Sequence, residues 1–140
     1  MGLTFLHLGI LLLLANVVKI TCNDVRPLIH LSNELPDPTP IYVGLSTDRD
    51  AFDSRRAILK RGGLYYFTLE SSGPDFFGEF NRGEGKDAKY ILATLYSRLR
   101  DVKNTRVQTD LYWKIDDVGV SLSYDDVNYG PKLPWLAKTN

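Results

Sequence analysis

The sequence predicts an all-β fold, a small antiparallel β-sandwich of about seven to eight strands in a single domain. After residue 25, turn-forming residues interrupt the chain at short intervals, and runs rich in β-branched and aromatic residues lie between them. All eight tyrosines and both tryptophans lie after residue 40. Aromatic side chains on strands bury large areas, so they are the expected filling of a sandwich core.

A run of apolar residues from Leu3 to Val18 predicts a secretory signal peptide. The alternative is an uncleaved membrane anchor, but the run is shorter than the roughly 20 residues that a membrane-spanning helix needs. Cys22 precedes the first polar stretch, so we expect cleavage after it, with cleavage after Ala15 as the second option. The predicted organisation is a signal peptide, 1–22, and one secreted, extracellular domain, 23–140, that does not insert in a membrane.

The predicted mature domain carries no cysteine and almost no net charge. Removing Lys19 with the signal peptide leaves 16 of the 17 basic residues against 17 acidic ones, a net charge of −1. Binding to nucleic acid or to anionic lipid needs a basic surface, so we expect neither. Small extracellular domains usually depend on disulfides, so burial alone has to hold this core together.

Alternating apolar residues predict the first three strands. Val25–Leu35 and Ile41–Leu45 each place apolar residues on one face, and three prolines separate them. Ser46–Arg61 holds eight charged residues and is predicted to be a charged connector. A two-glycine turn then leads into a third strand, Leu64–Leu69.

The second half of the chain adds a short strand and a hairpin. We predict the short strand at Asp75–Phe80, followed by a loop rich in glycine and charge at Asn81–Lys86. Leu111–Ile115 and Val120–Tyr124 alternate between apolar and polar residues, and the turn Asp116–Gly119 joins them. This arrangement predicts a β-hairpin.

Residues 88–99 fit two structures. Ala88, Ile91 and Leu95 fall at helical spacing, and no glycine or proline interrupts the segment, which indicates an amphipathic helix. A strand at Tyr90–Tyr96 is the alternative, either buried on both faces or at a sheet edge. Periodicity by itself leaves both open.

Few residues point to catalysis or to metal binding. His30 is the single histidine of the mature domain, and we interpret it as a polar-face strand residue because no serine motif accompanies it. Asp48, Asp50 and Asp53 suggest calcium, but their loop lacks the glycine and the distal glutamate of an EF-hand. We therefore predict no enzyme activity, no metal and no cofactor.

Several short motifs follow one another between Val25 and Tyr124. They are an alternation ending in Asn-x-Leu, a strand leading into a Ser/Asp-rich connector, a glycine before an aromatic strand, a second aromatic strand, a Tyr with an Arg-Asp pair, and an apolar-x-Trp strand before a Gly turn. The residues are Ile29, Leu31, Asn33, Leu35, Ile41, Val43, Leu45, Ser46, Asp48, Asp50, Gly63, Tyr66, Phe67, Leu69, Phe76, Phe77, Tyr96, Arg100, Asp101, Leu111, Trp113 and Gly119. In this order they resemble the plant self-incompatibility S-protein homologue family.

Members of that family are small secreted β-sandwiches, so the resemblance implies the same fold and favours a strand at Tyr90–Arg98. Most members also have four cysteines that form two disulfides. By position, Leu45 and Leu111 stand at the first and the last of these. The second would lie near Gly78 or Glu79, and the third between Thr105 and Gln108.

The resemblance implies a secreted, non-catalytic signalling or recognition protein, acting as a monomer, whose loops bind a cell-surface receptor protein. Loops on a rigid scaffold commonly carry such specificity. The candidate recognition residues are Asp48, Arg49, Asp50, Arg55, Arg56, Arg82, Glu84, Lys86, Asp116 and Asp117.

Two alternatives make different structural predictions. A secreted carbohydrate or cell-wall binding module requires a row of exposed aromatics on one sheet face, whereas the receptor hypothesis predicts charged loops and no such row. A hydrolase requires His30 beside a carboxylate in a cleft.

Overall fold

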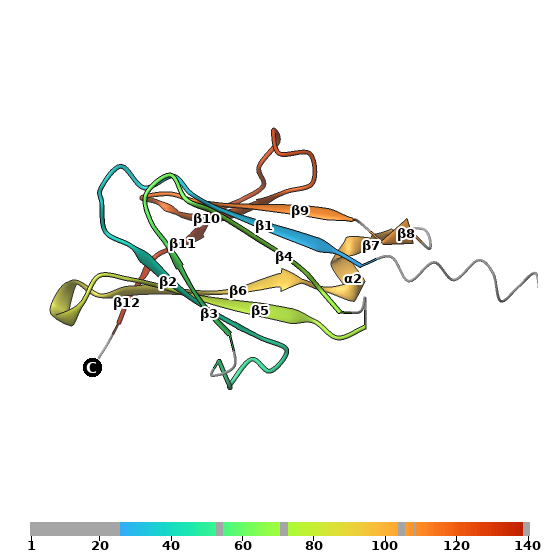
Figure 1. The fold of residues 1–140 in the computed structure, drawn as a ribbon, viewed down its shortest axis with the longest axis horizontal. Helices are drawn as coiled ribbons and strands as arrows, with labels where there is room; N and C mark the ends of the chain where they lie inside the picture. The colour runs from blue at the N-terminus through green and yellow to red at the C-terminus, as the bar shows by residue number, and fades with distance from the viewer. Residues whose placement is uncertain (1–25, 53–54, 71–72, 104–105, 108, 139–140) are drawn as a thin grey trace, which may run out of the picture.

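The protein is an all-β sandwich, as the sequence predicts. The structure, a computed structural model, describes residues 26–52, 55–70, 73–103, 106–107 and 109–138, and the predicted signal peptide lies outside them. Within this part, two five-stranded sheets, A and B, lie face to face around one apolar core (Figure 1). Of their ten strands, eight are five to eight residues long, and the other two are short additions near the C-terminus.

Sheet A has the strand order β11-β10-β9-β1-β4. Its strands are β1 (Leu28–Asn33), β4 (Leu64–Thr68), β9 (Asp110–Ile115), β10 (Gly119–Ser123) and β11 (Leu133–Pro134). The neighbours β1 and β9 run parallel, and the other pairs are antiparallel. The sandwich is therefore mostly antiparallel rather than wholly so, because the chain crosses to sheet B and returns before it forms β9.

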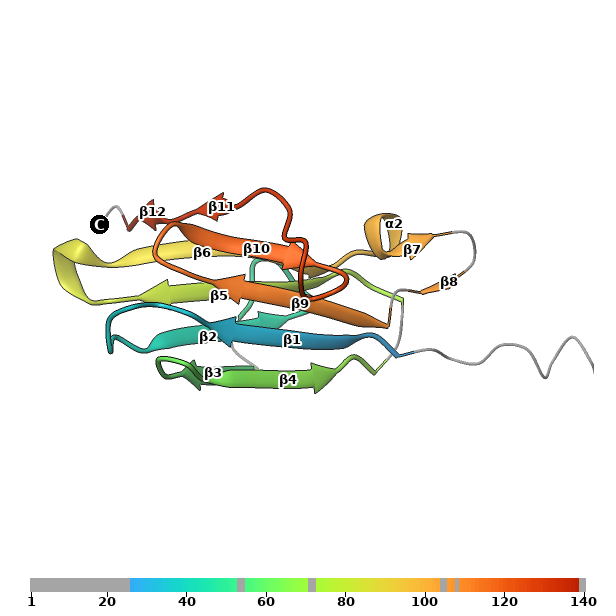
Figure 2. The ribbon, with the colours of Figure 1, turned by 90° about the horizontal axis from the view of Figure 1, so that it is seen from above.

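Sheet B has the order β12-β6-β5-β2-β3 and is antiparallel throughout. Its strands are β2 (Ile41–Ser46), β3 (Arg55–Leu59), β5 (Phe76–Arg82), β6 (Lys89–Tyr96) and β12 (Leu136–Ala137). Viewed from above, β3 and β4 lie along one side of the sandwich, and β11 and β12 lie along the other (Figure 2).

Three small elements complete the fold. A 3-10 helix, η1 (Gly85–Asp87), lies in the β5–β6 hairpin, and a single-turn helix, α2 (Arg98–Asp101), follows β6. The strands β7 (Val102–Lys103) and β8 (Arg106–Val107) then form a two-stranded ribbon. They lie at the opposite end of the sandwich from η1 (Figure 1).

The apolar alternation seen in the sequence faces the core. Ile29, Leu31, Leu111 and Ile115 of sheet A are 0% exposed, and the alternate residues of β2, β5 and β6 close the core from the other side. Burial of a Leu or Ile side chain stabilises a fold by roughly 1.5–3 kcal/mol, so these faces hold the two sheets together.

Two expectations about individual segments need correction. The predicted charged connector, Ser46–Arg61, contains the strand β3, whose Ala57 and Leu59 are buried. The apolar alternation of β3 is short, and the charged residues on either side of it obscure it in the sequence. The predicted loop Asn81–Lys86 begins later, because its first two residues extend β5.

The open question at residues 88–99 is settled in favour of a strand. β6 is an inner strand of sheet B, between β5 and β12, and its Ile91, Ala93 and Leu95 are buried. The helix expected from the spacing is reduced to the single turn of α2. Sheet pairing on both sides outweighs the helical preference of the isolated segment.

Candidate binding groove on the outer face of sheet B

A groove of about 530 Å³ lies on the outer face of sheet B. Strands β2, β5 and β6 contribute to its lining, together with the loop after β2, the β5–β6 hairpin and the C-terminal segment. The lining residues are Tyr42, Val43, Gly44, Asp50, Phe52, Glu79, Asn81, Gly83, Ala88, Lys89 and Lys138. The groove thus joins two segments predicted to carry recognition, the connector and the loop that follows β5.

The strand period explains why these side chains face outward. Ile41 and Val43 are buried in the core, so Tyr42 and Gly44 of the same strand lie on the opposite face. Phe52 packs against the bare backbone of Gly44, since a Cβ there would lie 3.1 Å from the Cβ of Phe52. The glycine therefore lets the connector fold back over the sheet and form one wall of the groove.

Two local hydrogen bonds start the connector loop. The backbone N–H of Asp48 donates to Ser46 Oγ at 2.9 Å, and that of Asp50 donates to Asp48 Oδ1 at 3.0 Å. Such bonds from a side-chain oxygen to the backbone two residues later are typical of Ser- and Asp-initiated turns. Asp48 thus shapes the loop, whereas Asp50 lines the groove.

The groove combines aromatic surface, charged side chains of both signs and one polar atom without a hydrogen-bond partner among the described residues. Tyr42 and Phe52 supply aromatic surface, while the acidic residues Asp50 and Glu79 are balanced by two lysines. The side-chain oxygen of Asn81 is buried, and no hydrogen-bond donor among the described residues contacts it. An unsatisfied buried carbonyl costs about 1–3 kcal/mol, and a ligand N–H or O–H would recover that cost once the side chain turns its oxygen toward the groove.

The predicted recognition residues separate into groups in the structure. Asp48, Arg49, Glu84, Lys86 and Asp117 are exposed. Arg55 and Arg56 belong to β3, and their side chains lie outside the described part. The connector residues lie beside the groove, whereas the residues after β5 and those of the β9–β10 turn gather at the end where β2 begins.

Two of the predicted residues are held by partners within the domain. Arg82 forms an ion pair with Asp37 and lies over the Trp135 ring, 6.0 Å from its centroid. Asp116 accepts hydrogen bonds from the backbone N–H groups of Val118 and Gly119 and pairs with Lys132. Both side chains therefore fix loop geometry rather than offer free charges.

Burial and hydrogen bonding compete at Asp116. Burial alone would raise the pKa of its carboxyl, but the hydrogen bond from Lys132 and those from the turn outweigh burial. The pKa of Asp116 is therefore held below its usual range, and the turn keeps its charged acceptor at neutral pH.

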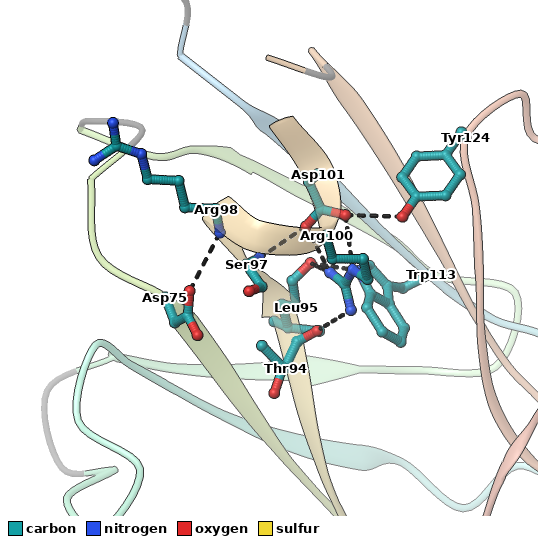
Figure 3. Close-up of polar contacts among 9 residues, drawn as sticks. All are labelled: Asp75, Thr94, Leu95, Ser97, Arg98, Arg100, Asp101, Trp113 and Tyr124. Atoms are coloured by element: carbon teal, nitrogen blue, oxygen red, sulfur yellow. Dashed lines mark hydrogen bonds and ion pairs between the residues drawn. The ribbon is translucent and has the colours of Figure 1, made fainter. Parts of the chain in front are cut away.

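A charge cluster lies at the opposite end of the sandwich, around α2 (Figure 3). Asp101 is 1% exposed, and both of its carboxylate oxygens accept hydrogen bonds. Arg100 donates to both oxygens at 2.7 Å, the Ser97 N–H donates to Oδ2, and the Tyr124 hydroxyl donates to Oδ1, the last two at 2.8 Å. Every oxygen of this buried carboxylate is satisfied, which indicates a structural role.

The remaining donors of Arg100 tie the cluster to β6. They reach the carbonyl oxygens of Thr94 at 2.9 Å and Leu95 at 3.0 Å, and the guanidinium lies over the Trp113 ring. Burial opposes the charge on Arg100, but Asp101 outweighs it, so the pKa of Arg100 is raised. Burial and the carboxylate of Asp101 both raise the pKa of Tyr124.

An aromatic row crosses the outer face of sheet A, contrary to the expectation for a receptor-binding protein. Tyr66, His30 and Tyr112 lie in register on β4, β1 and β9. The rings of His30 and Tyr112 stack with centroids 4.4 Å apart, and His30 Nε2 lies 3.2 Å from Asp110 Oδ1. His30 is thus beside a carboxylate, as a hydrolase would require, but on a partly exposed sheet face.

Comparisons with known proteins give no match, so a functional assignment has to rest on the geometry of the structure. No protein-family model, curated protein or solved structure matches the chain. Across the part of the chain that the structure describes, the helices are too short or too polar to cross a membrane. In the same part, no three His, Cys, Asp or Glu side chains come together as potential metal ligands.

The sequence indicated the loops of the groove but missed its floor. Glu79, Lys89 and Lys138 belong to it although none of them is among the predicted recognition residues. A usable signal was Gly44, because a glycine inside a strand often marks a close approach of another segment.

Proposed function

We propose that this chain is a secreted, non-catalytic recognition protein that binds a cell-surface receptor protein through the groove on sheet B and the connector loop beside it. The observation that carries the proposal is the groove itself. There the connector and the end of β5 meet around Asn81, whose buried side-chain oxygen has no donor in the described structure. Convergent polar groups in a concave site are the usual basis for a binding-site assignment.

The resemblance to the S-protein homologue family supports the proposal. Leu45 and Gly78, which stand where two of that family's cysteines are expected, are register partners on β2 and β5. Leu111 is fully buried, as a residue that replaces a bridge by packing has to be. The family's Arg-Asp pair corresponds to Arg100 and Asp101, which tie α2 to β6.

The groove chemistry suits a segment of folded or extended polypeptide. A backbone or side-chain N–H of the receptor would donate to Asn81, and an apolar side chain would lie against Tyr42 and Phe52. The opposite charges of Asp50 and Lys89 allow a segment with mixed charges to bind without net repulsion.

A carbohydrate or cell-wall binding module is the second candidate, and the aromatic row on sheet A favours it. Sugar rings stack on flat aromatic faces. The stacked His30 and Tyr112 rings already cover one face of each other, 18° from parallel, which leaves less flat surface for a sugar. Tyr66, 70% exposed, is the strongest sugar-stacking candidate of the row.

The test begins with secretion of the full-length chain from plant cells and measurement of the intact mass of the product. A product that begins at Asn23 is expected. Binding of the labelled product to plant cells should be saturable and lost after the cells are treated with protease. Binding that survives protease and is displaced by cell-wall oligosaccharides would replace the receptor proposal with the carbohydrate candidate.

Two groove variants locate the binding site. Asn81→Leu and Phe52→Ala should each weaken cell binding at least tenfold, because they remove a hydrogen-bond acceptor and an aromatic wall. Val127→Ala is the matched control, since Val127 is 76% exposed and lies outside the groove. Equal affinity of all three variants and the unmodified protein would exclude the groove.

A further inference from the structure

The two sheets end in four edge strands, and three of them are protected against pairing with another chain. β11 and β12 are two residues long, and β11 contains Pro134. β3 begins with Arg55 and Arg56. Short length, proline and charge are the usual ways in which natural proteins prevent edge-to-edge association.

The fourth edge, β4, has none of these protections. Its sequence Leu-Tyr-Tyr-Phe-Thr has no charge and no proline. Leu64 is 76% exposed, Tyr66 70% and Tyr65 36%, so a strand rich in large apolar residues faces solvent. An edge with these properties is a template for a further strand.

The backbone of β4 presents alternate residues to the open side. The carbonyl of Gly63 accepts from the N–H of Asn33, and the N–H of Leu69 donates to the carbonyl of Pro27, so odd-numbered residues bond toward β1. In an antiparallel pair, the intervening residues direct their N–H and C=O groups to the other side. Leu64, Tyr66 and Thr68 therefore direct theirs away from β1, toward an edge with which no strand of the described residues pairs.

We propose that β4 pairs with β4 of a second copy of this chain, antiparallel, with Tyr66 opposite Tyr66 on a two-fold axis. In this register Leu64 lies opposite Thr68 of the second copy, so residues whose N–H and C=O groups point away from β1 face one another. The two A sheets become one continuous sheet. A single surface that is complementary to itself is what a two-fold dimer requires.

The lack of charge on β4 favours a second copy over an unrelated strand. The residues Leu64 to Thr68 carry no charged side chain, so pairing this strand with itself brings no like charges opposite one another. Like charges directly opposite on neighbouring strands are destabilising. Across the two-fold axis, the same uncharged surface serves both copies.

Aromatic side chains on both faces of the sheet would also meet. On the inner face, Tyr65 lies opposite Phe67 of the second copy, and these rings already contact each other at 5.8 Å within one chain. On the outer face, the row Tyr112, His30, Tyr66 continues directly into its symmetry mate. Cross-strand aromatic pairs each add to the stability of a sheet, so the monomer expected from the sequence would be replaced by a dimer.

Sedimentation of the secreted product tests the dimer. The unmodified protein should sediment at twice the monomer mass at micromolar and higher concentrations, because interfaces reach at least micromolar affinity when they are well matched. Tyr66→Lys places two like charges on the axis and should yield a monomer with an unchanged melting temperature at low concentration. Ile58→Lys is the control, because Ile58 is 62% exposed on the β3 edge, and this variant should remain dimeric.

A charge-pairing experiment tests the register. Tyr66→Lys and Tyr66→Glu should each be monomeric alone, and an equimolar mixture should form a heterodimer, because the opposite charges meet on the axis. Three outcomes would overturn the proposal: an unmodified protein that is monomeric throughout, dissociation by Ile58→Lys equal to that by Tyr66→Lys, or a mixture that stays monomeric.

Discussion

Asp101 and Asn81 each have a side-chain oxygen out of contact with water, but their surroundings differ completely. Donors on Arg100, Ser97 and Tyr124 surround the carboxylate of Asp101. The carbonyl oxygen of Asn81 has no donor among the described residues. A complete hydrogen-bond shell stabilises a domain by itself, whereas an incomplete one at a groove leaves a position for a ligand.

The two sites also differ in the segments of the chain that they bring together. Asp101 joins α2 to Tyr124, which lies 23 residues further along, and closes one end of the sandwich. Asn81 lies on the outer face of sheet B and lines the same groove as Phe52, which packs against Gly44. Substitutions at the first should reduce stability, and those at the second should reduce binding.

The largest expected effect is that of Asp101→Ala. Removing the carboxylate leaves Arg100 partly buried without its partner, and loss of one member of a buried ion pair costs about 3–5 kcal/mol. Urea unfolding of the protein measures this loss. Asp117→Ala, an exposed carboxylate, should change the free energy of unfolding by less than about 0.5 kcal/mol. Equal effects of the two substitutions would contradict the structural role of the cluster.

Tyr124→Phe should cost about 1.5–3 kcal/mol, the usual value of a hydrogen bond to a charged group. The phenyl ring keeps the packing and removes the hydroxyl that donates to Asp101 at 2.8 Å. Urea unfolding of the double variant with Asp101→Ala completes a thermodynamic cycle. If the two losses simply add, the hydrogen bond contributes nothing and this assignment is wrong.

Alkaline pH should weaken the same contact. The pKa of Tyr124 is raised in the folded protein, by burial first and then by Asp101, so the folded state keeps its proton after the unfolded state has lost it. The stability that this proton contributes is complete below about pH 10 and is lost as the pH rises toward the folded-state pKa. In thermal melts between these limits, Tyr124→Phe should show a shallower decline than the unmodified protein. An identical decline would place the titrating group elsewhere.

At the groove, Asn81→Leu should leave the free energy of unfolding unchanged or raise it by about 1 kcal/mol, because it removes an unsatisfied buried oxygen. The same variant is expected to lose partner binding. A loss of stability comparable to that of Tyr124→Phe would mean that Asn81 supports the fold, and the contrast with Asp101 would disappear.

The smallest expected effect is at Asp116, whose pKa is lowered although burial alone would raise it. Its contribution is complete above the unfolded-state pKa of about 3.9 and is lost as the pH falls through the lower folded value. Because the Lys132 partner is 38% exposed, Asp116→Asn should cost less than about 1 kcal/mol at neutral pH. The substitution should also reduce the loss of stability at acid pH. Melting temperatures measured at decreasing pH would detect this difference.

Strands with a clean two-residue period were predictable from the sequence. Ile29 and Leu31 of β1, and Leu111 and Trp113 of β9, are buried at the predicted positions. β3 was missed because only Ala57 and Leu59 mark its inner face. Pairing on both sides fixes β6, and no local pattern reports on pairing with distant strands.

The candidate site was predictable only in part for the same reason. Asp50 was identified from its charged loop and does line the groove. Asn81 gained its significance from neighbours on β2 and β6, to which sheet pairing brings it. The parallel pairing of β1 with β9 was likewise not predicted. The apolar alternation identifies each strand, but it does not show which strand lies beside it.

That parallel pairing determines when sheet A can fold during synthesis of the chain. β1 is the first strand of the described residues, yet its neighbour β9 follows about 80 residues later, the separation of His30 and Asp110. Until β9 emerges, β1 has β4 on one side and nothing on the other, so sheet A cannot close before most of the chain is present. Distant pairings of this kind slow folding, and because residues 23–140 contain no cysteine, no disulfide within them can hold an early intermediate together.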